Sequence, residues 1–172
     1  MSDRLVFERF GSNFTIPVTL MVVGEAPGYE EAKTGIPFVG KSGKLLDTWL
    51  EALSIDKNYV ITNIVKEHPI DNNGKNRPPT TEEIEKWNPV LYIEINTYIP
   101  KYILALGNTA YKELAENNSA SITQAVTFPK ILKLNPKYNV ESKVLVFWHP
   151  SYVMRNNLDV TNQLNKIKSL IT

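Results

Sequence analysis

Three polar side chains in this 172-residue sequence are candidates for binding or catalysis. Glu25 lies in the segment GEAPG, where two glycines and a proline predict a tight turn whose backbone amides can face an anion or a carbonyl. Asn63 offers one acceptor and two donors, which match the O4 and N3–H edge of uracil and mismatch the amino group of cytosine. His149 carries an imidazole that could stabilise negative charge on a departing base.

Each of these residues also has a purely structural interpretation: a solvated glutamate in a turn, an asparagine that caps a strand end, or a histidine bonded to the backbone. Their combination favours a functional site, because each follows a predicted strand. The absence of cysteine excludes disulfides, thiolate zinc sites, iron–sulfur ligation and cysteine nucleophiles. The two histidines disfavour a multi-histidine metal site. Neither a Walker motif nor G-x-G-x-x-G follows the first strand.

The elements that must position these residues can be read from the apolar pattern. Strands are predicted at Thr19–Val23, Tyr59–Val65, Tyr102–Leu106 and Lys143–Trp148. These segments lack a clean alternation, as expected when both faces of a sheet are covered. Helices are predicted at Gly40–Leu53, from Thr81 toward Tyr98, after Gly107, and at Asn162–Ile171.

Local signals refine the helix boundaries. Thr80 and Glu83 form a capping box before the second helix, and Pro89 predicts a break or kink within it. Asn108 is expected to cap the third helix. Residues 66–79 are rich in proline, asparagine and glycine and predict a loop.

The alternation of strands and helices predicts an α/β fold, specifically a three-layer α/β/α sandwich with a central four-stranded, mainly parallel sheet. One domain over residues 1–172 is expected, since 42% of the chain is hydrophobic. In such sheets ligands bind beyond the carboxyl ends of the strands. That rule selects residues 24–28, Asn63, residues 107–108 and residues 149–155.

Charge and targeting signals are unremarkable. The 19 Lys and Arg residues balance 18 Asp and Glu residues, so disorder is not expected. A net charge of +1 is compatible with DNA binding through a local basic face. The N-terminal segment lacks the pattern of a signal peptide, and the apolar runs are too short to span a bilayer. A cytoplasmic protein without membrane association is expected.

Five blocks of the sequence resemble the family 4 uracil-DNA glycosylases and keep the order of that family. They are VVGEAPGYEEAKTGIPFVGKSGKLLD (22–47), TNIVK (62–66), NRPPTTEEI (76–84), ILALGNTA (103–110) and HPSYVMRN (149–156). The first and last blocks are the most specific. The resemblance implies a uracil-DNA glycosylase-like fold. It also implies a monofunctional DNA glycosylase, which flips a damaged or non-standard base out of DNA and hydrolyses its N-glycosidic bond to leave an abasic site.

The resemblance also implies residue roles. Glu25 would lie against the scissile bond and hold the attacking water, and His149 would hydrogen-bond O2 of the leaving base. Phe38 would stack on the flipped base, and Asn63 would read its Watson–Crick edge. Glu25 and His149 would together stabilise the separating charges, so no covalent nucleophile and no lyase activity are expected. The expected base-binding residues are Gly24, Ala26, Pro27, Gly28, Tyr29, Phe38 and Asn63.

The segment Ser151–Arg155 resembles the loop that enters the duplex and fills the vacated space. Tyr152, Val153 or Met154 would be the wedge, and Arg155 would hold phosphate. The expected partner of this monomer is DNA, single- or double-stranded, bound in a salt-dependent manner. The expected DNA-binding residues are Lys41, Ser42, Lys66, Arg77, Ser151, Tyr152, Val153, Met154 and Arg155.

The sequence departs from the family in one respect. Family 4 enzymes carry an iron–sulfur cluster held by four cysteines, and this chain has none. Glu67 and Trp87 stand at or near two of the ligand positions, and the loop between them looks lengthened. We predict that the cluster and any other metal or cofactor are absent, and that packing around Trp87 substitutes for the cluster.

Several interpretations of the substrate remain open. Tyr29 near the C5 edge of the base would exclude thymine, whereas an outward-turned Tyr29 would make room for a modified base. Uracil is the leading interpretation. The alternatives are the same chemistry on a modified base, such as a hypermodified pyrimidine in phage DNA in anti-phage defence, or on a deaminated purine. Two further interpretations of the function remain. One is a catalytically silent DNA-binding relative or inhibitor decoy, and the other is a nucleotide-binding α/β protein without glycosylase activity.

Overall fold

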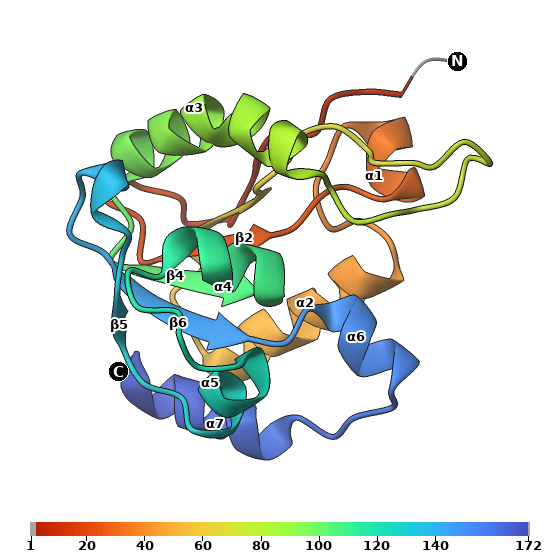
Figure 1. Ribbon diagram of the computed structural model, residues 1–172. Helices are drawn as coiled ribbons and strands as arrows, with labels where there is room; N and C mark the ends of the chain where they lie inside the picture. The colour runs from red at the N-terminus through yellow and green to blue at the C-terminus, as the bar shows by residue number, and fades with distance from the viewer. Residues whose placement is uncertain (1–2, 172) are drawn as a thin grey trace.

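A computed structural model describes residues 3–171 and alternates strands with helices along the chain (Figure 1). Residues 1–2 and 172, the ends of the predicted domain, lie outside the described residues. The strands are β1 (Arg9–Phe10), β2 (Leu20–Gly24), β3 (Tyr59–Asn63), β4 (Tyr102–Leu106), β5 (Leu132–Lys133) and β6 (Lys143–Phe147). The helices are α1 (Tyr29–Thr34), α2 (Lys41–Leu53), α3 (Thr81–Tyr98), α4 (Asn108–Leu114), α5 (Ile122–Thr127), α6 (Pro150–Arg155), α7 (Thr161–Leu170) and the 3-10 turn η1 (Pro136–Tyr138). Within residues 3–171 no helix is long and apolar enough to cross a membrane.

The sheet has the order β1-β3-β2-β4-β6-β5. The four inner strands are parallel, which confirms the predicted parallel core. The two outer strands β1 and β5 are antiparallel and only two residues long, so the sheet has six strands rather than four. Sequence periodicity missed these edge strands because two residues are too few to show an alternation.

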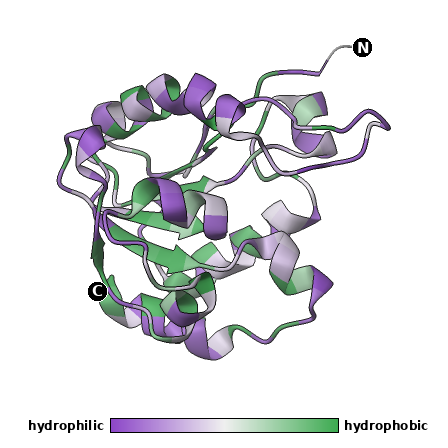
Figure 2. Ribbon diagram, in the orientation of Figure 1, coloured by the Kyte–Doolittle hydropathy of each residue, from purple (hydrophilic) through white to green (hydrophobic). Residues whose placement is uncertain are grey.

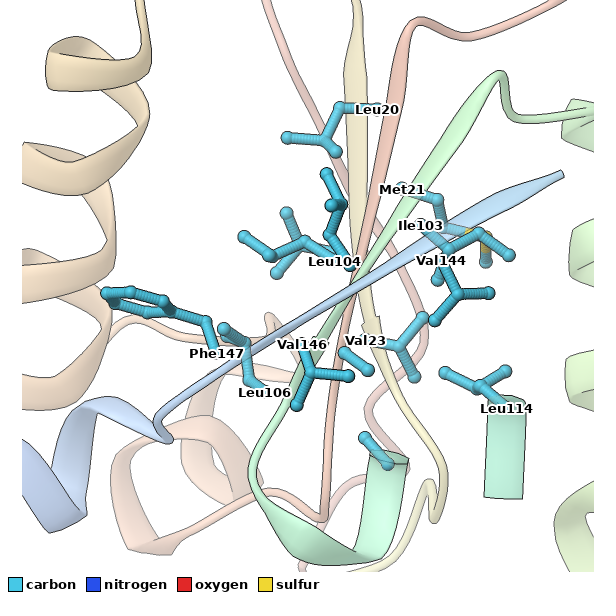
Figure 3. Close-up of a cluster of buried hydrophobic side chains, with 14 of the residues drawn as sticks. Leu20, Met21, Val23, Ile103, Leu104, Leu106, Leu114, Val144, Val146 and Phe147 are labelled. Carbon is cyan, nitrogen blue, oxygen red and sulfur yellow. The ribbon is translucent and has the colours of Figure 1, made fainter. Parts of the chain in front are cut away.

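Helices cover both faces of the sheet and give the predicted α/β sandwich. The green strands in the middle of Figure 2 lie between helices whose outer surfaces are largely hydrophilic. Figure 3 shows Leu20, Leu104 and Phe147 on one side of the strands and Met21, Ile103 and Val144 on the other. On the first side, Trp49 of α2 packs edge-on against Phe147, with ring centroids 4.9 Å apart. All of these side chains are almost fully buried, so the strands are apolar on both faces.

Two predictions about helices need correction. Helix α3 begins at Thr81, with Thr80 as the N-cap of the predicted capping box, and it runs through Pro89 without the break that the sequence allowed. Pro89 is exposed, and the flanking Trp87 and Leu91 pack into the core, so their burial outweighs one missing backbone hydrogen bond. At α4 the N-cap is Gly107 with a φ of 89°, and Asn108 is the first helical residue. The left-handed backbone at the cap explains why glycine stands there.

Candidate active site

A cleft of about 990 Å³ opens at the carboxyl ends of the parallel strands, where the sequence predicts ligand binding. Its walls come from the turn after β2, the end of β3, the turn between β4 and α4, and helix α6. The predicted site residues that line it are Glu25, Ala26, Pro27, Gly28, Tyr29, Phe38, Lys41, Ser42, Asn63, Arg77, His149, Ser151, Tyr152 and Arg155. The predicted residues outside this lining are Gly24, Lys66, Val153 and Met154.

Gly24, the last residue of β2, lets two side chains of the cleft approach the backbone closely. A Cβ atom at Gly24 would lie 2.5 Å from Cζ of Phe38 and closer still to Oδ1 of Asn63. Real Cβ atoms do not make such contacts, so any side chain would push Phe38 and Asn63 apart. Gly24 therefore shapes the cleft from beneath, without lining it.

Glu25 is half-buried, and its carboxylate is held by a residue that the sequence did not single out. The hydroxyl of Thr109 donates a hydrogen bond of 2.5 Å to Oε2 of Glu25. Thr109 lies in the first turn of α4, 84 residues further along the chain. The parallel pairing of β2 with β4 brings their following turns together, which no local sequence signal reveals. The hydrogen bond fixes the orientation of the Glu25 carboxylate in the cleft wall.

Glu31 is a second residue that sequence reasoning missed. Its Oε1 accepts a hydrogen bond from the N–H of Gly28 at 3.1 Å. Its Oε2 accepts from the N–H groups of Val39 at 2.9 Å and Gly40 at 2.8 Å. One carboxylate thus ties the turn that carries Glu25 to the loop that carries Phe38. Sequence patterns did not predict the short helix α1, which positions Glu31, so this role was missed.

We expect Glu31→Ala to lower the free energy of unfolding by about 1–3 kcal/mol, because it leaves three backbone N–H groups without their acceptor. The matched control is Glu30→Ala, since the Glu30 side chain is exposed and forms a surface ion pair with Lys33. Denaturant unfolding followed by circular dichroism measures both. Equal stability of the two variants would show that the Glu31 contacts do not hold these loops.

Phe38 is buried against the histidine of the cleft. Its ring centroid lies 5.8 Å from that of His149, with an angle of 34° between the ring planes. Phe38 has a φ of 56°, an unfavourable conformation for a residue with a side chain. Arg9 stabilises this backbone by donating to the carbonyls of Pro37 at 3.1 Å and Phe38 at 3.2 Å, while pairing with Asp47 at 2.9 Å. Arg9 is also absent from the predicted set, because its contact spans 29 residues.

Asn63 is the last residue of β3 and is only 1% exposed. Its Oδ1 is buried and has no hydrogen-bond partner among residues 3–171. Leaving a buried polar atom unpaired costs about 1–3 kcal/mol. Because Asn63 also lines the cleft, this atom is the strongest local indication of a ligand with a complementary donor.

Lys66 was predicted to contact DNA, and the structure contradicts this. Its ammonium group is fully buried and donates to Glu94 at 2.7 Å, to the Thr62 hydroxyl at 2.6 Å and to the Asn63 carbonyl at 2.5 Å. Burial lowers the pKa of Lys66 and raises the pKa of Glu94, and the ion pair opposes both shifts. A charge sequestered in this way cannot neutralise phosphate. It supports the end of β3 instead.

His149 is the N-cap residue of α6, and this role fixes its tautomer. Its Nδ1 accepts from the N–H of Ser151 at 3.2 Å and lies 2.7 Å from the Ser151 hydroxyl. An accepting Nδ1 leaves Nε2 as the protonated donor. Burial, helped by the charge of Arg155, lowers the pKa of His149 to about 4. At neutral pH the residue is therefore an uncharged imidazole with Nε2–H available.

The predicted loop Ser151–Arg155 is in fact helical, because Pro150 occupies the first position of α6 and His149 caps it. The three wedge candidates differ in their surroundings. Val153 is 5% exposed and belongs to the hydrophobic core, so the prediction that it contacts DNA is wrong. The Tyr152 ring stacks on Trp148, and Met154 is 42% exposed.

Tyr29 lines the cleft, and both its hydroxyl and its ring contact the loop of residues 67–79. Its hydroxyl donates to the carbonyl of Gly74, and its ring packs edge-on against His68 with centroids 4.7 Å apart. The ring is thus tied to the loop of residues 67–79, which projects beside α1 (Figure 1). From the same loop, Arg77 lines the cleft and pairs with Glu83 at 2.6 Å. Lys41, at the start of α2, is exposed.

Glu67 and Trp87, which stand at or near two cluster-ligand positions of the family, do not fit an iron–sulfur cluster. Glu67 pairs with Lys86 at 3.0 Å, and no thiol occurs in the chain. Trp87 is buried and packs edge-on against Phe7, with ring centroids 6.3 Å apart. Residues 3–171 contain no group of three or more His, Cys, Asp or Glu side chains that could hold a metal ion.

Comparisons with known proteins agree with this geometry. Residues 12–170 match the model of the uracil DNA glycosylase superfamily. A type-4 uracil-DNA glycosylase of Thermotoga maritima is 39% identical over 149 residues, which cover 86% of this chain and 71% of that protein. Enzymes of the same name from Sulfurisphaera tokodaii and Pyrobaculum aerophilum are 36% and 34% identical, over 80% and 79% of this chain and 61% and 68% of theirs. The chain therefore belongs to the uracil-DNA glycosylase superfamily and is a DNA glycosylase, a hydrolase of N-glycosyl bonds.

Proposed function

We propose that this enzyme excises uracil from DNA and leaves an abasic site. The observation that carries the proposal is the buried Oδ1 of Asn63, which has no hydrogen-bond partner in the described part of the chain. It lies in a cleft that also holds Phe38, Glu25 and His149. The N3–H of uracil is a suitable donor for that oxygen, and its O4 can accept from the amide nitrogen of Asn63. Stacking on Phe38 adds to these contacts and offsets the few kcal/mol that flipping requires.

Bond cleavage is proposed to proceed by charge separation. As the bond between C1′ and the base nitrogen breaks, its electron pair leaves with the base, and Nε2–H of His149 hydrogen-bonds O2. Glu25, oriented by Thr109, stabilises the positive sugar and holds the water whose oxygen bonds to C1′. The Glu25 carboxylate accepts the proton that this water loses, and the departing base anion takes up a proton from solvent, which balances the hydrolysis. No covalent enzyme intermediate is required, so the proposal includes no lyase activity.

Oligonucleotides bearing one uracil, hypoxanthine or 5-hydroxymethylcytosine test the proposal. After incubation with the enzyme, hot alkali cleaves strands at abasic sites, and gel electrophoresis counts them. We expect cleavage of the uracil strand alone. If uracil is retained in both single- and double-stranded DNA, the proposal is wrong.

A modified base is the second candidate substrate. Two observations favour it: Tyr29 is turned toward the loop of residues 67–79, and the cleft of about 990 Å³ is at the upper end of the range for small-molecule sites. Release of 5-hydroxymethylcytosine but not uracil in the same assay would support this candidate over uracil.

One DNA molecule is proposed to bind across the cleft of a monomeric enzyme. Lys41, Arg77 and Arg155 supply positive charge at its rim, and Ser42 and Ser151 supply hydroxyl groups. Met154 is the proposed wedge. It is an exposed apolar side chain of α6, whereas the exposed ring of Tyr152 is already stacked on Trp148. A single hydrophobic core that reaches every layer supports one domain.

The rate of uracil release is expected to stay constant between pH 7.5 and 5.5. His149 has a lowered pKa of about 4, so its neutral form persists as pH falls through 6.5 and is lost only near pH 4. Arg155→Gln should move this loss to higher pH, because the Arg155 charge contributes to the shift. Single-turnover rates at saturating enzyme give the profile. A midpoint near 6.5 in the unmodified enzyme would contradict the buried, neutral imidazole.

A further inference from the structure

An aromatic pair in the cleft wall has no part in the proposed bond cleavage. Trp148 follows β6 directly, and Tyr152 lies one helical turn further on in α6. Their rings are stacked, with centroids 4.8 Å apart and an angle of 29° between the planes. Both residues line the cleft, on either side of His149 and Ser151 in the chain.

The surrounding structure holds this pair in place before any ligand binds. The His149 cap and Pro150 set the direction of α6, and Val153 anchors the helix in the core. Tyr152 nevertheless remains 38% exposed. Within residues 3–171 its hydroxyl makes no hydrogen bond with another side chain or with the backbone, so the residue offers an aromatic face rather than a polar contact.

We propose that Tyr152, which is stacked on Trp148, also stacks on the nucleobase next to the flipped one in single-stranded DNA. This inference rests on the proposed function. Aromatic faces bind any base, and each such stack is worth about 1–3 kcal/mol. Arg155, exposed three residues further along α6, supplies the positive charge for the adjoining phosphate. The cleft is far larger than one base needs, which leaves room for a second nucleotide.

The strandedness follows from the availability of the base face. In a duplex the neighbour of a flipped base stays paired and stacked on its other side, so it cannot turn toward a tyrosine in the cleft wall. In a single strand the same base can rotate freely and exchange solvent for the aromatic ring. The pair therefore favours single-stranded over double-stranded DNA.

Binding of labelled single strands tests the proposal, with fluorescence anisotropy as the measurement. Each strand carries a stable abasic analogue at its central position, which represents the vacated site. A second analogue replaces the neighbouring nucleotide on the 5′ side or on the 3′ side in two further strands. The protein variants are Tyr152→Ala, Tyr152→Phe and, as a matched control, Tyr92→Ala, which removes an equally exposed tyrosine (39%) from α3.

We expect Tyr152→Ala to weaken binding of the first strand by about 5- to 150-fold, the equivalent of 1–3 kcal/mol. The loss should vanish on one of the two strands that lack a neighbouring base, and it should be smaller on the matching duplex. Tyr152→Phe, which keeps the ring, should restore binding, and Tyr92→Ala should not weaken it.

Three results would overturn the proposal: no loss in Tyr152→Ala, an equal loss on all three strands, or binding by Tyr152→Phe as weak as that of the alanine variant. An equal loss would mean that Tyr152 acts through the position of α6. Because binding is measured without base release, the test is independent of excision. If the enzyme releases no uracil but Tyr152→Ala still loses affinity only where the neighbouring base is present, the proposed function is wrong and the stacking proposal stands.

Discussion

Asn63→Ala is expected to reduce uracil release by about 100-fold without lowering the stability of the protein. The variant loses two hydrogen bonds to the base, and about 1.4 kcal/mol for each gives a factor near 100. Stability is expected to stay equal or rise slightly, because the removed Oδ1 is buried and has no hydrogen-bond partner within residues 3–171. Few substitutions at a residue with 1% exposure would behave in this way.

Single-turnover excision and denaturant unfolding measure the two effects separately. Asn72→Ala serves as the control, since Asn72 is exposed in the projecting loop and outside the cleft lining. Two outcomes contradict the assignment. Retained excision would mean that Asn63 does not read the base, and a loss of several kcal/mol of stability would mean that its amide is satisfied within the protein.

Lys66→Met is expected to destabilise the protein by about 3–5 kcal/mol. The substitution leaves the Glu94 carboxyl buried without its partner, and breaking a buried ion pair from one side carries this penalty. The double variant Lys66→Met with Glu94→Leu should recover most of the loss, because it removes both charges together. Guanidinium unfolding of the single and double variants gives the free energies.

The same variants test whether the buried Lys66 contacts DNA. For the folded double variant, the dependence of DNA affinity on salt concentration should equal that of the unmodified enzyme. Arg155→Gln should reduce the slope by about one, because an exposed side chain that contacts phosphate is lost. A reduced slope in the Lys66 double variant would restore Lys66 as a phosphate contact.

The sequence by itself determined the parallel core and the identity of most cleft residues. The strands β2 and β4 are continuous apolar runs and β3 and β6 are mainly apolar, and such runs are visible without any tertiary contact. Since strand ends of a parallel sheet share one edge, the predicted motifs at those ends had to converge. The correct placement of Glu25, Asn63 and His149 in one cleft follows from this rule.

Only the tertiary structure decided which polar groups are available. Lys66 and Arg155 look alike as basic residues in motif blocks, yet one is buried against Glu94 and the other is exposed. The contacts of Thr109 with Glu25 and of Arg9 with the Phe38 loop span 84 and 29 residues. Burial and long-range hydrogen bonds depend on how distant segments pack, and local composition carries no record of that packing.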